Sequence, residues 1–137
     1  MKSTLASLAL FAISPAAAQG FYESCYQSWS LGYHHSANFL VASCPGPDGA
    51  NHTGAIDLQD CLTNTEGVLK ASRLGTAFYS CKSCSASTTN ATITCQCQNS
   101  TNRYLTTELD LDTVITNKDG IVGCFDLPGI EVAPAEL

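Results

Sequence analysis

"AIDLQDCLTNTEGVLK", residues 55–70, and "ELDLDTVITNKDGIVG", residues 108–123, repeat one pattern within a chain of 137 residues. Each stretch has an apolar residue before Asp-Leu, a short mixed segment, then Thr-Asn, an acidic residue and a glycine. Asn64 and Asn117 mark the same point in the two stretches and are 53 positions apart. The duplication predicts two copies of one structural unit, each too small to bury a core alone.

Short strands are the main elements that the two copies predict. Residues 39–44 and 91–97 are β-branched or alternating runs, and residues 103–109 are a third run of this kind. Turn-forming residues separate the runs. The composition of each copy therefore favours an all-β fold without a helix of ordinary length.

The repeated stretches themselves predict a helical turn followed by a hairpin. Asp57 and Asp110 precede the turn and are expected to cap it. Tight hairpin turns are expected at residues 64–67 and 117–120, where a glycine follows an acidic residue.

The eight cysteines predict a disulfide framework, because an even number in an exported chain is typical of one. Cys25 with Cys44 and Cys81 with Cys97 hold equivalent places in the two copies. We therefore expect each of these pairs to join neighbouring strands.

Cys61 and Cys124 have no counterpart in the other copy, so each is left for the other. A Cys61–Cys124 bridge would tie the two copies together. It should also disfavour a form that opens and exchanges halves between two chains.

Four cysteines close together in the second copy allow more than one arrangement. A Cys84–Cys95 bridge would lie inside the Cys81–Cys97 pair and would require a one-residue bulge in the strand ladder. The swapped pairing, Cys81–Cys95 with Cys84–Cys97, stays open from the sequence. Four thiolate ligands for zinc are the other alternative, which an oxidising secretory route disfavours.

The N-terminus has the features of a secretory signal peptide. Lys2 precedes an apolar segment at residues 5–13, and small residues follow at 16–18. We expect residues 1–18 to be removed, leaving a secreted, extracellular protein. Residues 19–127 are then one domain, with repeats at about 20–74 and 75–126 and a flexible C-terminal tail at 128–137.

The chain is acidic, with 12 Asp and Glu residues against 6 Lys and Arg and a formal net charge of −6. This balance argues against nucleic acid as a partner. We expect no membrane partner either, because no stretch after the signal peptide is apolar for long enough to cross a bilayer. Asn-x-Ser/Thr sequons predict N-glycosylation at Asn51, Asn90 and Asn99.

These residues resemble the cyanovirin-N homology (CVNH) domain family. The resemblance lies in the doubled pattern "IDL…N…G", present as Ile56-Asp57-Leu58 before Asn64 and Gly67, and again from Leu109 to Gly120. A paired-cysteine unit precedes each pattern. The match covers roughly residues 20–125, almost the whole expected mature chain.

The resemblance implies an all-β fold of two pseudo-symmetric repeats, each with a three-stranded sheet and a β-hairpin. The strands are exchanged between the repeats, and disulfides staple the fold. It also implies a lectin for mannose-rich glycans or glycoproteins, with no catalytic activity, no cofactor and no metal. We expect a monomer, with a domain-swapped dimer through residues 71–76 as the alternative.

The carbohydrate-binding residues that the resemblance implies lie at the two hairpin turns. Sugars need hydrogen-bonding side chains in shallow pockets. Asn is also a good turn former without any ligand, so a structural role is equally open for Asn64 and Asn117. The expected binding residues are Asn64, Glu66, Tyr79, Ser80, Gln98 and Asn102 for one pocket and Glu23, Ser24, Asn117 and Asp119 for the other.

The main alternative function is a disulfide-rich secreted protein that keeps this fold and binds a protein or cell-wall partner. An enzyme is not expected, because nothing in the spacing of the 12 acidic residues singles out a catalytic pair. Adjacent histidines at 34 and 35 would face opposite sides of a strand, so they are poorly placed to share a metal.

Overall fold

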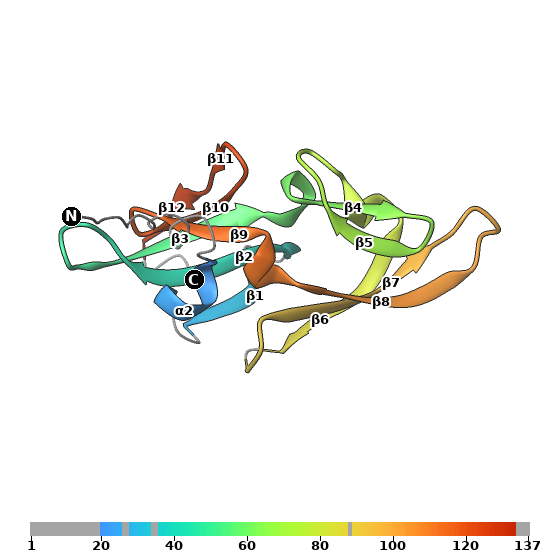
Figure 1. Ribbon diagram of the computed structural model, residues 1–137, viewed down its shortest axis with the longest axis horizontal. Helices are drawn as coiled ribbons and strands as arrows, with labels where there is room; N and C mark the ends of the chain where they lie inside the picture. The colour runs from blue at the N-terminus through green and yellow to red at the C-terminus, as the bar shows by residue number, and fades with distance from the viewer. Residues whose placement is uncertain (1–19, 26–27, 34–35, 88, 134–137) are drawn as a thin grey trace, which may run out of the picture.

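Antiparallel strands form most of the computed structural model, which describes residues 20–25, 28–33, 36–87 and 89–133. Figure 1 shows an elongated molecule with two lobes side by side along its long axis. The signal peptide expected at residues 1–18 lies outside the described residues. Within them, no helix is long and apolar enough to cross a membrane.

Each lobe is built on three antiparallel strands from one copy of the repeat, and in the first lobe a late strand, β12 (Ile130–Glu131), adds a fourth strand to this sheet. In both sheets the middle strand pairs with the strands before and after it in the chain. The strands are β1 (Trp29–Tyr33), β2 (Ser36–Pro45) and β3 (Asn51–Asp57) in one lobe, and β6 (Cys81–Ser87), β7 (Thr92–Gln98) and β8 (Tyr104–Asp110) in the other.

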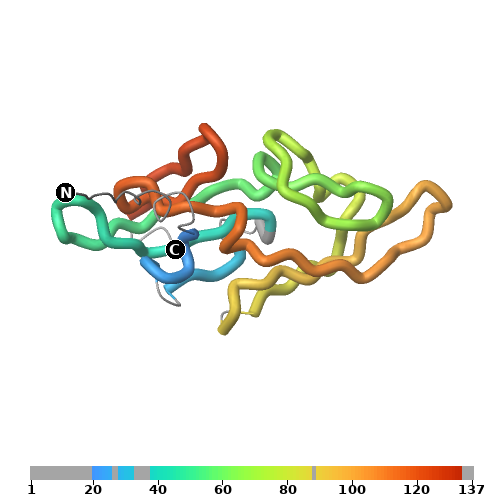
Figure 2. Tube along the Cα trace, in the orientation of Figure 1, coloured from blue at the N-terminus to red at the C-terminus, as the bar shows by residue number. Residues whose placement is uncertain are grey.

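The two hairpins are exchanged between the lobes, which confirms the arrangement that the CVNH resemblance implied. The β4–β5 hairpin (Leu62–Thr65 and Val68–Ala71) follows the first sheet in sequence but packs against β7 and β8. The β9–β10 hairpin (Ile115–Lys118 and Ile121–Cys124) packs against β2 and β3. Figure 2 shows the chain passing to the other lobe after β3 and returning after β8.

Short helical turns lie at both crossings. They are η2 (Leu58–Asp60) and η4 (Leu111–Thr113), and each begins with an aspartate cap. Asp57 accepts a hydrogen bond from the Gln59 amide at 3.0 Å, and Asp110 accepts one from the Asp112 amide at 3.0 Å. The predicted capping role is therefore confirmed. Two further turns, α2 (Phe21–Cys25) and η3 (Ala77–Tyr79), precede the two sheets.

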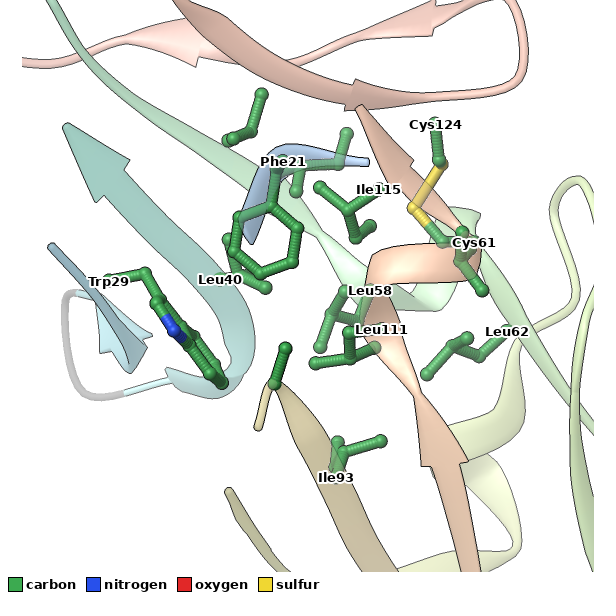
Figure 3. Packing of buried hydrophobic residues seen from close by; sticks show 14 of the residues in the cluster. Phe21, Trp29, Leu40, Leu58, Cys61, Leu62, Ile93, Leu111, Ile115 and Cys124 are labelled. Atoms are coloured by element: carbon green, nitrogen blue, oxygen red, sulfur yellow. A yellow bond between two sulfur atoms is a disulfide. The ribbon is translucent and has the colours of Figure 1, made fainter. Parts of the chain in front are cut away.

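Repeat-related apolar side chains meet in one core between the lobes (Figure 3). Leu58 and Leu111 from the two crossings are fully buried, as are Leu62 and Ile115 from the two exchanged hairpins. Each such side chain stabilises the fold by roughly 1.5–3 kcal/mol relative to an exposed one. Trp29 packs edge-on against Phe21 in the same core, at 5.5 Å between ring centroids, and is 5% exposed.

Four disulfides stabilise this core. Cys25–Cys44 and Cys61–Cys124 are the predicted pairs, whereas the sequence left two pairings open for the other four cysteines, and the structure has the nested one. Ser83 has a positive φ of 54° and lies where the β6–β7 register shifts between Lys82 and Ser85. This irregularity is the predicted bulge, and it lets Cys84 reach Cys95. The bridges are Cys25–Cys44, Cys61–Cys124, Cys81–Cys97 and Cys84–Cys95.

Sheet pairing continues past residue 127, where the sequence analysis placed the end of the domain. β11 (Leu127–Pro128) pairs with β10, and β12 (Ile130–Glu131) pairs with β3. Gly129 lets the chain turn between them, because a Cβ there would lie 2.2 Å from the Val122 carbonyl oxygen. The first part of the predicted tail therefore covers the edge of the first sheet.

Candidate functional site

Polar side chains gather at the turn of each exchanged hairpin, and each group combines residues from both copies. The first-hairpin site joins the β4–β5 turn to the end of η3 and the loop after β7. The second-hairpin site joins the β9–β10 turn to α2 and the loop after β2. The predicted members are Asn64, Glu66, Tyr79, Ser80, Gln98 and Asn102 in the first and Glu23, Ser24, Asn117 and Asp119 in the second.

Asn64 attaches the first hairpin to the sheet on which it packs. Its Nδ2 donates to the Ser80 Oγ and to the Gln98 carbonyl oxygen, both at 2.8 Å. Its Oδ1 accepts a hydrogen bond from the Gly67 amide at 2.8 Å. Because both amide protons and the oxygen are engaged, Asn64 holds the site together rather than offering free groups to a ligand.

Asn117 has the same role in the second-hairpin site. Its Nδ2 donates to the Ser24 Oγ at 3.3 Å and to the Pro45 carbonyl oxygen at 3.2 Å. Its Oδ1 accepts from the Gly120 amide at 2.7 Å. The structural role that the sequence left open for both asparagines is therefore the one that the geometry supports.

Tight turns with left-handed backbone place one acidic side chain at the tip of each hairpin. Glu66 and Gly67 have φ angles of 52° and 89°, and Asp119 and Gly120 have 56° and 101°. This conformation is typical of two-residue hairpin turns. The Oε1 of Glu66 accepts from the Ser100 Oγ at 2.9 Å, so the first tip is tied to the loop after β7.

Hydrogen bonds within the loop after β7 fix the conformation of this loop, which forms one side of the first-hairpin site. The Asn99 Oδ1 accepts from the Thr101 amide at 3.0 Å, from the Thr101 Oγ1 at 2.8 Å and from the Arg103 amide at 3.0 Å. The Gln98 Nε2 donates to the Asn102 Oδ1 at 3.4 Å, and Asn102 is exposed. Gln98, Asn102 and Glu66 thus offer amide and carboxylate groups on a preorganised rim.

Tyr79 and Glu23 each directly precede, in the sequence, the serine whose hydroxyl group accepts a hydrogen bond from the site's asparagine. Tyr79 ends η3 and its side chain is 84% exposed. Glu23 lies in α2 one residue before Ser24 and is also exposed. The two sites therefore have the same scaffold but differ at this position, with an aromatic ring in one and a carboxylate in the other.

His52 is the group near the second-hairpin site for which the sequence indicated no role. Its Nε2 lies 3.2 Å from Asp48 Oδ1, in the loop after β2, and its Nδ1 lies 3.1 Å from Glu131 Oε2 on β12. The Glu131 carboxylate, and after it Asp48, raise the pKa of His52 above its ordinary value. His52 in turn lowers the pKa of Asp48.

Glycines bring the second-hairpin turn close to this histidine. A Cβ at either Gly46 or Gly120 would lie 2.8 Å from the His52 ring. The spacing of four between Asp48 and His52 was the only sequence signal for this contact. Glu131 carried none, because its position depends on the late strand β12.

The sequons occupy three different surroundings. Asn51 and Asn90 are exposed, at the start of β3 and in the turn between β6 and β7. Asn99 is half-buried on the loop of the first-hairpin site. A glycan at Asn99 would therefore stand beside that site, whereas glycans at the other two positions would not.

The cysteine sulfurs of the described chain are all in disulfides, so none of them is available as a thiolate zinc ligand. Among the described residues, no group of three or more His, Cys, Asp or Glu side chains is arranged to hold a metal ion. The polar groups at the hairpin turns are amides, hydroxyls and carboxylates, with the Lys118 ammonium group at the second turn.

The family model described as the CVNH domain matches residues 21–122, from α2 through the first hairpin and into the last strand of the second hairpin. The chain belongs to the CVNH family. The match confirms the resemblance seen in the repeated "IDL…N…G" pattern. No curated protein is similar enough in sequence to match this CVNH chain.

Solved structures with the same fold include the NMR structure of GzCVNH from Gibberella zeae, with a TM-score of 0.62 and 17% identity over 76% of this chain and 95% of that one. A microvirin–mannobiose complex has a TM-score of 0.59 and 22% identity over 78% and 99% of the two chains. A MoCVNH3 variant in complex with (N-GlcNAc)4 has a TM-score of 0.60 and 15% identity over 71% and 94%. At these identities the likeness establishes the fold.

Proposed function

We propose that this CVNH protein is a secreted lectin that binds mannose-type glycans and catalyses no reaction on them. The observation that carries the proposal is the convergence of Glu66, Gln98 and Asn102 beside an exposed tyrosine at the first-hairpin site. These groups supply both donors and acceptors on an open surface, which is what sugar hydroxyls require. Sugar complexes of two CVNH structures, one with mannobiose and one with (N-GlcNAc)4, support the same ligand class.

The first-hairpin site is the better candidate of the two. Its loop is held by the hydrogen bonds of Asn99, and its hairpin tip is fixed by the Glu66–Ser100 contact. Preorganised groups lose little freedom when a ligand binds. In the second-hairpin site the equivalent loop contains Pro45 and Pro47, which have no amide proton to donate.

Secretion and glycosylation belong to the proposal. The N-terminal pattern of residues 1–18 supports export, and four disulfides suit an oxidising compartment. Occupied sequons would add glycans at Asn51, Asn90 and Asn99. Of these, the Asn99 glycan would compete with ligand for the first-hairpin site.

The test is a glycan array followed by calorimetric titration, using oxidised protein from residue 19 to 137 with its own glycans removed. We expect selective binding to mannose-terminated glycans, and a loss of binding in a Gln98→Ala, Asn102→Ala double variant. A matched double variant, Glu108→Ala with Thr106→Ala, changes exposed β8 side chains outside both sites and should bind normally. A blank array from folded protein would refute the lectin assignment and favour a protein partner.

A further inference from the structure

Tyr79 is the most exposed large apolar residue in the part of the chain that the structure describes. Its exposed fraction is 84%, whereas the other exposed ones range from 40% to 54%. A ring left in water at this level contributes little to the stability of the fold. At the first-hairpin site, this exposure leaves the ring available to contact a ligand.

The backbone on both sides of Tyr79 is held firmly. The Phe78 amide donates to Gln59 Oε1 at 2.6 Å, and the Ser80 amide donates to the Ala77 carbonyl oxygen at 3.1 Å. The Ser80 carbonyl oxygen accepts from the Gln98 amide at 2.9 Å. The Cα of Tyr79 is consequently fixed against the strand that carries Gln98, although its ring extends into solvent.

The segment that carries Tyr79 is part of the proposed lectin site. Ser80, which follows Tyr79 directly, accepts the Asn64 amide at 2.8 Å, and η3 contacts β4. An aromatic face beside fixed amide and carboxylate groups can cover the C–H side of a sugar ring while its hydroxyls are hydrogen-bonded. The equivalent position in the other site is Glu23, which offers no such face.

We propose that Tyr79 is a stacking platform that gives the first-hairpin site a subsite for a neutral pyranose with equatorial substituents, such as N-acetylglucosamine. This inference rests on the proposed lectin function. Equatorial substituents leave axial C–H groups on both faces of the ring, so such a sugar lies flat on an aromatic side chain. The axial 2-hydroxyl of mannose interrupts one of these faces. Tyr79 thus adds a preference for a sugar ring with equatorial substituents, next to the groups that contact mannose.

The charged groups at this site offset each other. Glu66 lies at the hairpin tip and is bonded to the loop after β7, and the exposed Arg103 ends that loop. The site therefore offers no net charge to a charged sugar, and the subsite takes a neutral one.

The experiment compares an N-acetylglucosamine tetramer with mannobiose by titration calorimetry against the wild type, Tyr79→Ala, Tyr79→Phe and a control, Phe125→Ala. Phe125 is an exposed ring at the β10–β11 turn, outside both sites. We expect Tyr79→Ala to weaken tetramer binding about fivefold or more, because an aromatic contact of this kind has that magnitude. Tyr79→Phe keeps the ring face, so its affinity should stay within about twofold of the wild type, as should that of the control.

A spectroscopic measurement separates stacking from a loss of structure. In saturation-transfer NMR at matched fractions of bound tetramer, the axial C–H protons of one sugar ring should receive more magnetisation, relative to the other protons of the tetramer, from the wild type and Tyr79→Phe than from Tyr79→Ala. Equal tetramer affinity of wild type and Tyr79→Ala would overturn the inference. Binding of mannobiose without binding of the tetramer would also overturn it, while leaving the lectin function intact. Failure to bind either sugar would refute the lectin function itself.

Discussion

Asn64 Nδ2 lies 2.8 Å from Ser80 Oγ, although the two residues belong to different copies of the repeat. Asn117 makes the equivalent contact with Ser24 in the other lobe, at 3.3 Å. Each asparagine therefore joins an exchanged hairpin to the sheet that receives it. The pair explains why an asparagine recurs at this point of both repeated stretches.

Replacing Asn64 by Ala should lower the free energy of unfolding by about 2 kcal/mol, because three partly buried hydrogen bonds are lost. Asn117→Ala should cost less, about 1 kcal/mol, since its two donor contacts are longer and exposed. Urea denaturation measures both. An Asn64→Ala protein of wild-type stability that no longer binds glycan would show instead that Asn64 contacts the ligand.

The Cys61–Cys124 bridge should control both stability and oligomeric state. It joins residues 63 apart in sequence and links η2 to the hairpin from the other copy. A loop of that length corresponds to about 4 kcal/mol in the chain-entropy model. A Cys61→Ala, Cys124→Ala variant should unfold at lower denaturant and form a concentration-dependent dimer, visible by size-exclusion chromatography with light scattering.

The matched control for this variant is Arg73→Ala, which removes an exposed ion pair with Asp126 at 2.6 Å but keeps the bridge. Exposed ion pairs contribute only about 0–1 kcal/mol, so we expect little change in unfolding and a monomer. A double-cysteine variant that stays monomeric at every concentration would contradict the role assigned to the bridge.

His52 should make stability depend on pH. Its pKa is raised in the folded protein by Glu131 and Asp48, so the protonated ring stabilises the fold. This contribution is fully present below the unfolded pKa of about 6.5 and is lost as the pH rises through the folded pKa. The melting temperature of the wild type should therefore fall between mildly acidic and mildly alkaline solution.

Asp48, the partner of His52, should make stability depend on pH in the opposite direction. The pKa of Asp48 is lowered, so its contribution is present above its unfolded pKa and is lost as the pH falls through the folded one. His52→Gln should flatten the alkaline slope of melting temperature against pH. The same alkaline slope in wild type and variant would mean that another group is responsible.

The aspartate caps should matter for stability and not for ligand binding. Asp57→Ala removes the acceptor of the Gln59 amide and should cost about 1 kcal/mol, whereas Asp57→Asn keeps an acceptor and should cost less. Thermal denaturation with parallel glycan titration checks this. A change in affinity without a change in stability would place Asp57 in the binding site.

The sequence predicted those features that depend on neighbouring residues or on the repeat. The aspartate caps and the hairpin turns follow from local pattern. The β6–β7 bulge was predicted only for a Cys84–Cys95 bridge, and the cysteine spacing left the swapped pairing open beside it. The cross-repeat bridge of Cys61 with Cys124 followed because neither residue has a counterpart. In each case the information lies within one copy or in the comparison of two copies.

Contacts that depend on a third, non-repeated segment were not predictable. Ile130 and Glu131 form a strand of two residues that has no periodicity, so its pairing with β3 left no pattern in the sequence. The link from Glu131 to His52 depends on that pairing. The sequence left two roles open for Asn64, because the number of its amide groups already engaged is visible only once Ser80 and Gln98 are in place.

The exchange of hairpins also sets the order in which the chain can fold during synthesis. The sheet of β1–β3 is complete once residue 57 has left the ribosome, but the hairpin that covers it ends at residue 124. At roughly 5–20 residues per second, its apolar face waits several seconds for a partner. During synthesis the first half is thus the stage at which this apolar face is most open to aggregation, and translation of the β9–β10 hairpin ends the exposure.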